Sequence, residues 1–107
     1  MLPKKNRVSK KEVDLIFKQS KFITSSSLTF KYLKSNGKVV KVSFIAPKNI
    51  AKLAVQRNLL RRHGYSALEK HLNQFPLGIV GVFVFKRLEE DILILENEIK
   101  TILAKIN

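Results

Sequence analysis

Residues 79–85, IVGVFVF, decide the fold, because they form an almost unbroken apolar run in a chain that is otherwise rich in lysine. A strand with one face in solvent alternates apolar and polar residues, whereas a continuous apolar run is typical of a strand covered on both faces. No apolar run in the chain approaches the ~18 residues of a membrane span. We therefore predict a buried β-strand at residues 79–85.

Two further strands are predicted on the N-terminal side of this run. Residues 28–34, LTFKYLK, alternate with Leu28, Phe30 and Tyr32 on one side. Residues 39–46, VVKVSFIA, alternate in the same way, with Val40, Val42, Phe44 and Ala46 on one face. Asn36-Gly37 lies between the two runs and is a strong hairpin signal, so we predict that these strands pair as a hairpin.

Three helices are predicted around the strands. The first follows Ser9, whose spacing to Glu12 fits a capping box, and presents Val13, Ile16 and Phe17 on one face. The second spans about residues 50–72, with Asn49 as its cap and Gly64 as a point of bending or early termination. The third spans residues 88–106, and the residues expected to face inward from it are Leu88, Ile92, Leu95, Ile99, Ile102, Leu103 and Ile106. The order α-β-β-α-β-α predicts one α+β domain over residues 1–107, with helices packed on a small sheet.

The charge distribution indicates an anionic partner. The 107 residues carry a formal net charge of +13, and residues 1–88 hold 19 of the 21 basic and only 3 of the 8 acidic side chains. Such a field attracts polyanions through counterion release. Because no segment joins a large apolar face to a basic one, a nucleic acid is favoured over a membrane. The chain has no cysteine, and residues 1–7 lack the apolar stretch of a signal peptide, so we expect a cytoplasmic protein.

Residues 55–64, VQRNLLRRHG, contain the strongest candidate binding site. On a helix Arg57 and Arg61 share a face, and Asn58 and Arg62 form the adjacent row. Arginine presents a planar fork that suits phosphate, and asparagine adds an amide. We expect Val55, Leu59 and Leu60 to be buried on the opposite side. A solvated helix face is the alternative, and the absence of nearby acids favours binding.

Two other groups of residues carry side chains that are capable of binding or chemistry. Phe17, Phe30 and Tyr32, together with Phe22, are interleaved with lysines, a pattern that suits stacking on single-stranded nucleic acid. Each aromatic taken singly is more often a core residue, with Tyr32 as the main exception because its hydroxyl needs a partner. His63 and His71 are eight residues apart, too far for one acid–base site on a straight helix, and no nucleophile accompanies them. We predict no catalytic residue, no protein metal site and no organic cofactor.

Three stretches resemble the protein subunit of bacterial ribonuclease P. They are a basic opening followed by a helix ending in Phe-Lys, a central Arg-Asn motif with a basic pair beyond it, and a last strand that ends in basic residues. In this chain they read LPKKNRVSKKEVDLIFKQSKF, PKNIAKLAVQRNLLRR and GVFVFKR.

The resemblance implies a fold related to domain 2 of ribosomal protein S5, with a left-handed βαβ crossover. It implies an accessory subunit of an endoribonuclease in which a catalytic RNA, with bound Mg²⁺, removes the 5′ leader of precursor tRNA. The expected partners are ribonuclease P RNA, with one protein per RNA, and precursor tRNA. Carried over by position, the RNA-binding residues are Lys48, Lys52, Arg57, Asn58, Arg61 and Arg62. The leader-binding cleft comprises Phe17, Phe30 and Tyr32.

The chain departs from the family pattern at four places. Leu59 replaces the motif's second arginine, Asn49 replaces a common lysine, Ser25 and Ser26 replace a polar-basic pair, and Gly64 interrupts the helix. These differences predict a weakened or shifted RNA contact. A ribosomal or general RNA-binding protein remains the alternative function, and a protein-only nuclease using His63 or His71 is disfavoured.

Overall fold

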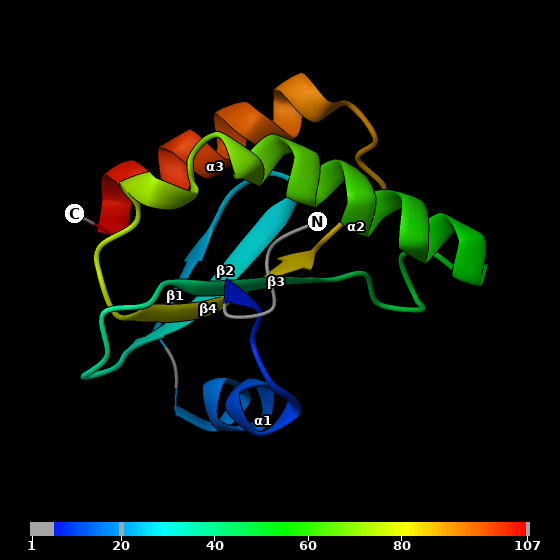
Figure 1. Cartoon of the computed structure of the whole chain (residues 1–107). Coiled ribbons are helices and arrows are strands. Elements are labelled where there is room, and N and C mark those ends of the chain that lie inside the picture. Colours follow the sequence, from blue (N-terminus) through cyan, green and yellow to red (C-terminus); the bar gives the residue numbers. More distant parts are fainter. Residues whose placement is uncertain (1–5, 20, 107) are drawn as a thin grey trace.

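The computed structural model describes residues 6–19 and 21–106. Within these residues three helices and four strands follow one another, and the 3₁₀ turn η2 lies between α2 and β4 (Figure 1). Their bounds are α1 Lys10–Gln19, β1 Lys21–Thr24, β2 Leu28–Lys34, β3 Lys41–Ile45, α2 Ala54–Glu69, η2 Leu72–Gln74, β4 Ile79–Phe85 and α3 Ile92–Ile106. The predicted α+β class is confirmed, and β1 is an additional strand.

The sheet has the order β1-β2-β4-β3, so β4 has neighbours on both edges. It pairs antiparallel with β2, where Phe30 lies opposite Phe83, and parallel with β3, where Phe44 lies opposite Phe83. Helices α2 and α3 cover one face of the sheet and α1 lies on the other (Figure 1). This arrangement explains why residues 79–85 are apolar at every position, and it confirms the predicted buried strand.

The predicted hairpin between β2 and β3 is wrong. β4 lies between these strands, and the hairpin partner of β2 is β1, whose four residues are mostly exposed and gave no strand pattern. The Asn36-Gly37 segment instead packs beside Gly78, whose carbonyl accepts hydrogen bonds from the Ser35 amide at 2.8 Å and the Ser35 hydroxyl at 3.0 Å. The most apolar strand takes an interior position beneath the helices, because there both of its faces and both of its edges are covered.

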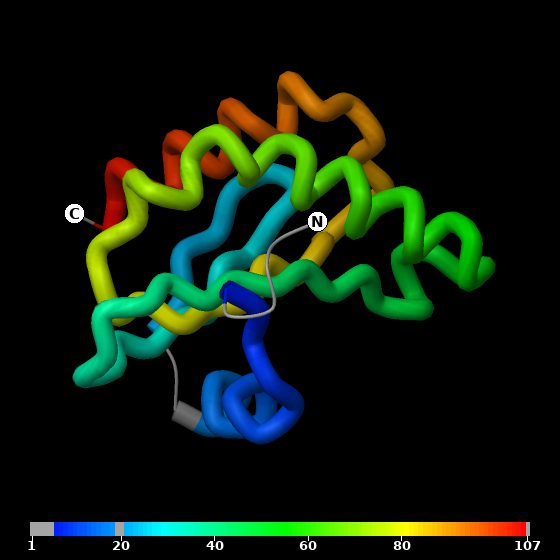
Figure 2. The backbone as a smooth tube through the Cα atoms, viewed as in Figure 1, coloured from blue at the N-terminus to red at the C-terminus, as the bar shows by residue number. Residues whose placement is uncertain are grey.

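The connection from β3 to β4 runs through α2 (Figure 2). Figure 1 shows the chain leaving β3, returning over one face of the sheet and re-entering along β4, in the left-handed sense that the resemblance implied. α2 begins at Ala54 rather than at residue 50, because the amides of Ile50 and Ala51 bind the Pro47 carbonyl in a separate turn. Asn49 is therefore not the cap.

The main core lies between the sheet and helices α2 and α3, and stacked phenylalanines fill its centre. The rings of Phe30 and Phe83 lie 4.4 Å apart, and those of Phe44 and Phe83 lie 4.9 Å apart. Gly64 lies on the buried face of α2, where an added Cβ would stand 2.6 Å from the Phe44 ring. The helix continues past this residue to Glu69, so Gly64 permits a close approach of helix to sheet rather than a break.

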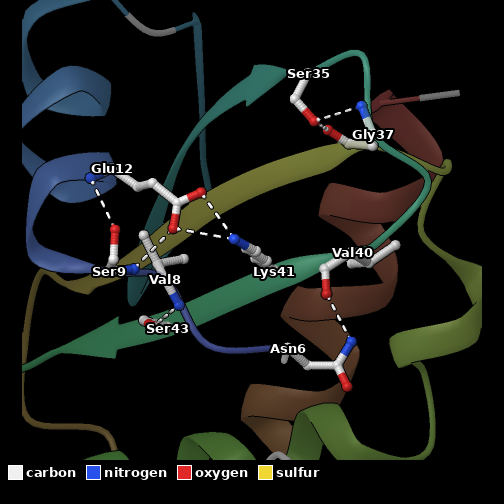
Figure 3. A network of polar contacts seen from close by, with 10 residues as sticks. Asn6, Val8, Ser9, Glu12, Ser35, Gly37, Val40, Lys41 and Ser43 are labelled. Carbon is white, nitrogen blue, oxygen red and sulfur yellow. Dashed lines mark hydrogen bonds and ion pairs between the residues drawn. The ribbon is translucent and has the colours of Figure 1, made fainter. Parts of the chain in front are cut away.

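A smaller core and a polar network hold α1 on the other face. Ile16 is fully buried and packs in a cluster with Val80 and Val82. The Ser9–Glu12 capping box is confirmed: the Ser9 amide donates to Glu12 Oε1 at 2.9 Å, and the Glu12 amide donates to Ser9 Oγ at 3.3 Å (Figure 3). Lys41 of β3 reaches the same carboxylate at 3.2 Å. Burial alone would raise the pKa of Glu12, but the bonds from Ser9 and Lys41 lower it below its usual value.

Two residues that were predicted to face inward from the last helix lie outside its buried face. Asp91 caps α3 by accepting a hydrogen bond from the Leu93 amide at 2.9 Å, so the helix starts at Ile92 rather than at residue 88. Leu88 and Ile92 are therefore exposed, while Leu95, Ile99, Ile102 and Leu103 are buried as predicted.

We expect the stability of the protein to fall in acid, partly through Glu98. Its Oε1 accepts hydrogen bonds from the Ser25 hydroxyl and, at 2.7 Å, from the Ser27 amide, which joins α3 to the β1–β2 turn. Burial alone would raise the pKa of Glu98, but these bonds lower it below its usual value. A lowered folded-state pKa contributes stability above the unfolded value of about 4.3, and that contribution is lost as pH falls through the folded value.

Urea unfolding followed by circular dichroism between about pH 7 and pH 2.5 measures this loss, since the window spans the carboxylate range. We expect Glu98→Gln to flatten part of the decline, and the matched change Glu90→Gln, at an exposed position, to preserve it. Identical profiles for the two variants would contradict the role of Glu98.

Candidate nucleic-acid interface

An open groove runs along the outer edge of β3, beneath the exposed side of α2. Its volume is about 700 Å³. Five of its lining residues come from α2 and two from β3; they are Asn58, Arg61, Arg62, Tyr65, Ser66, Ser43 and Phe44. No carboxylate lines the groove, so the two arginines leave it positively charged.

The groove is shaped by the contact between α2 and the edge strand. The Tyr65 hydroxyl accepts a hydrogen bond from the Phe44 amide at 3.3 Å, and the two rings meet edge to face with centroids 5.1 Å apart. This bond satisfies a backbone donor that the last strand of a sheet would otherwise leave unpaired. Tyr65 thereby holds the face of α2 that carries Asn58 and Arg61 in a fixed position against β3.

The structure brings three of the six sequence-predicted RNA-binding residues together in this groove. Asn58, Arg61 and Arg62 line it, and Arg61 Nη2 donates to Asn58 Oδ1. Arg57 does not line it. Lys48 and Lys52 are exposed in the segment that leads into α2. The six predicted RNA-binding residues are thus not all in one place. Three line the groove, and the two lysines lie in the adjoining segment before α2.

The expected burial of Val55 and Leu59 is wrong. Val55 is 70% exposed and Leu59 is 38% exposed, whereas Leu60 is fully buried. The buried face of α2 consists of Leu60, Gly64, Ala67 and Leu68. Leu59, which replaces the family's second arginine, therefore adds an apolar side chain to the surface beside the basic residues.

The three residues assigned to a leader cleft do not lie on one surface. Phe30 is fully buried, and Tyr32 is partly buried beside it with ring centroids 5.3 Å apart. Phe17 belongs to α1 on the other face of the sheet, where Lys31 Nζ lies 4.5 Å from the centre of its ring. Because Phe30 and Lys31 are consecutive in β2, their side chains point to opposite faces.

A different aromatic residue accompanies Phe17 on the α1 face. Phe22 of β1 is 67% exposed and lies directly opposite Lys31 in the strand pairing, so the two side chains share a face. Phe22, Lys31 and Phe17 therefore form an exposed aromatic-lysine surface. The sequence grouped Phe22 with the other aromatic candidates, but it could not show that Phe22 shares a face with Phe17 and Lys31, because β1 was not predicted and its register on β2 places Phe22 there.

The two histidines form no acid–base pair. His71 is buried and its Nε2 lies 3.1 Å from Glu96 Oε1, while His63 belongs to α2. The bond with His71 lowers the pKa of Glu96 below its usual value, and Lys100 acts in the same direction. Across residues 6–19 and 21–106, no three His, Asp or Glu side chains gather as a metal-binding group.

No helix in the described part of the chain has the length and apolarity needed to cross a membrane.

Comparison with known proteins identifies one family. The family model described as Ribonuclease P matches residues 2–107. The structure of the RNase P protein from Thermotoga maritima superposes with a TM-score of 0.83 at 17% identity, covering 94% of this chain and 97% of that one. The RNase P protein of Staphylococcus aureus gives a TM-score of 0.80 at 13% identity, with 95% of each chain covered. No curated protein matches the chain in sequence.

Proposed function

The chain belongs to the ribonuclease P protein family, whose role is the processing of tRNA 5′ ends within an RNA-containing endoribonuclease, and from this premise we propose how its surfaces serve that role. The catalytic step belongs to the RNA subunit, and the protein binds that RNA together with the 5′ leader of precursor tRNA. One protein per RNA is the proposed stoichiometry.

The groove between α2 and β3 is the proposed binding site for ribonuclease P RNA. It presents two arginines and an asparagine without a neighbouring carboxylate in its lining. Arginine forks form strong charge-assisted bonds with phosphate oxygens, and the asparagine amide adds a donor and an acceptor for a sugar or base. Leu53, which precedes α2, has no side chain that can cap the helix, and the first turn contains no acidic residue. The positive end of the helix dipole therefore adds to the field that attracts the RNA.

The aromatic-lysine surface on the α1 face suits the single-stranded leader. Phe17 and Phe22 offer exposed rings on which bases can stack, and Lys31 lies between them to contact the backbone phosphates. Base stacking on aromatic side chains contributes about 1–3 kcal/mol per base and tolerates different sequences. Phe30 is excluded from this role because it is fully buried, and Tyr32 packs beside Phe30 on the core side.

Mg²⁺ is proposed to be held mainly by the RNA subunit. The described residues of the protein offer no clustered carboxylate and histidine ligands for it, and Mg²⁺ in such sites is commonly bound through phosphates and water. The protein's contribution is positive charge: its basic side chains neutralise phosphates and lower the Mg²⁺ concentration that the RNA needs to fold and to bind its substrate.

The test is cleavage of precursor tRNA at low Mg²⁺ by the organism's own ribonuclease P RNA, with and without this protein. We expect 5′-leader removal only when both are present. Enhancement should fade at high Mg²⁺, where metal ions replace the protein's charge. If the protein gives no enhancement but binds ribosomal RNA tightly, the alternative role as a ribosomal or general RNA-binding protein is correct. Cleavage by the protein alone would indicate a nuclease that uses its own side chains.

A further inference from the structure

Arg57 is held by the backbone that precedes its own helix. Its Nη1 donates to the carbonyl of Ala51 at 3.1 Å and to the carbonyl of Lys52 at 2.9 Å. Nη1 carries two hydrogens, so these two bonds use its full donor capacity. The guanidinium of the family's first motif arginine is thus directed toward its own chain, while Asn58, Arg61 and Arg62 line the groove.

The segment that Arg57 holds has few other anchors, one of which is the hydrogen bond from the Leu53 amide to Gln56 Oε1 at 3.3 Å. It connects β3 to α2, and the amides of Ile50 and Ala51 bind the Pro47 carbonyl at 3.1 and 3.0 Å. The side chain of Ala51 is fully buried, but it is only a methyl group, and Leu53 at the start of the helix is exposed. Lys48 and Lys52 both project from this segment and are exposed. A short loop of this kind loses its conformation readily when a hydrogen bond is removed.

We propose that Arg57 is a positioning residue, which orders residues 47–53 so that Lys48 and Lys52 face the same RNA as the groove. The proposal rests on the proposed RNA-binding function. Arginine suits the task because its guanidinium is always charged and its rigid fork can bridge two adjacent carbonyls. A charge-assisted bond to a carbonyl is also stronger than a neutral one. Arg57 accordingly contributes to RNA binding indirectly, by holding Lys48 and Lys52 in position.

The first test uses the protein without RNA and follows hydrogen exchange of the backbone amides by NMR. We expect Arg57→Ala to accelerate exchange at Ile50 and Ala51 by about tenfold, because the turn around Pro47 opens more often. Arg61→Ala removes the same charge from the groove and should leave these two amides unchanged. Arg57→Lys should restore part of the protection, because an ammonium can still donate to the carbonyls. Unchanged exchange in Arg57→Ala would overturn the anchoring.

The second test is a pair of double-mutant cycles on affinity for the organism's ribonuclease P RNA. Of the two lysines, Lys52 is held more directly, because its own carbonyl accepts a hydrogen bond from Arg57. Removing Arg57 should therefore cost less affinity once Lys52 is gone. We expect Arg57→Ala to weaken binding about tenfold in the natural chain and less than about threefold in a Lys52→Ala background. In an Arg61→Ala background, Arg57→Ala should still weaken binding about tenfold, so that the two losses of affinity multiply. The reason is that Arg61 belongs to the groove and not to the segment.

Each other outcome overturns the proposal in a recognisable way. Full multiplication with Lys52→Ala, together with a salt slope lowered by about 0.7–0.9 in Arg57→Ala alone, would mean that Arg57 binds its own phosphate. Equal coupling to Lys52 and Arg61 would indicate a general loss of structure, which a shifted urea midpoint would reveal. If Arg57, Lys52 and Arg61 variants all bind the RNA as the natural chain does, the proposed RNA site itself fails.

Discussion

Phe30→Ala is expected to reduce the free energy of unfolding by about 3–5 kcal/mol, the usual cost of deleting a buried phenylalanine ring. The Phe30 ring is fully buried and lies against Phe83 at 4.4 Å, Tyr32 at 5.3 Å and Phe75 at 5.8 Å. Its removal leaves a cavity at the point where β2 and β4 meet the core. Since domains of this size are stable by only about 5–15 kcal/mol, the variant should be partly unfolded near 37 °C. Urea denaturation followed by circular dichroism measures the loss.

Two companion variants separate packing from RNA contact. Phe30→Leu retains most of the volume and should cost less than about 1.5 kcal/mol, so the folded protein can be assayed. It should bind a single-stranded leader RNA as tightly as the natural chain does. Phe22→Ala, at an exposed position on the neighbouring strand, should change stability by at most about 0.5 kcal/mol and weaken leader binding by about 1–3 kcal/mol. If Phe30→Leu weakened leader binding and Phe22→Ala did not, Phe30 would belong to the leader-binding surface after all.

Local patterns in the sequence predicted most elements of the fold but not their pairing. The alternation of β2 and β3 and the apolar run of β4 identified three strands, because side-chain periodicity is a local property. Which strand lies beside which is decided by the burial of whole faces and edges. β4 separates the two strands that Asn36-Gly37 was expected to join. The four residues of β1 are mostly exposed, so they carry no hydrophobic signal from which a strand could be predicted.

Which of the candidate residues come together in space was easier to predict on α2 than on the sheet. Helical spacing placed Asn58, Arg61 and Arg62 together, as the groove requires. The same spacing could not show that Arg57 bonds the carbonyls of Ala51 and Lys52, because those contacts depend on where the helix begins. On the sheet, alternation showed that Phe30 and Tyr32 share a face. It could not show that α2 and α3 cover this face while the Phe17 side remains more open.

The two candidate RNA surfaces therefore lie in different parts of the molecule. The groove follows the β3 edge beneath α2, whereas Phe17, Lys31 and Phe22 lie on the α1 face near β1 and β2. β1 and β3 are the two outer strands of the sheet. The leader of precursor tRNA and the RNA subunit can therefore bind these two surfaces at the same time, because they do not compete for the same side chains. This separation predicts that leader stacking and RNA docking can be weakened independently.

The double variant Arg61→Gln/Arg62→Gln is expected to weaken binding to ribonuclease P RNA on the order of 100-fold at moderate salt. Hydrogen bonds that involve a charged partner contribute about 1.5–3 kcal/mol each, and loss of two at the lower value gives this factor. If each arginine neutralises one phosphate, the slope of log affinity against log salt should fall by about 1.4–1.8. Filter binding across a range of salt concentrations measures both quantities. Stability should change little, because both side chains are exposed.

The matched control removes two positive charges from α3 instead, as Lys100→Gln/Lys105→Gln. Both lysines are exposed and neither lines the α2–β3 groove, so this variant lowers the net charge equally but leaves the groove intact. We expect it to weaken binding only slightly, through the general field of the protein. At low Mg²⁺ the groove variant should also lose its enhancement of precursor-tRNA cleavage, while the control retains it. Equal losses in the two variants would mean that net charge, rather than the geometry of the groove, determines RNA binding.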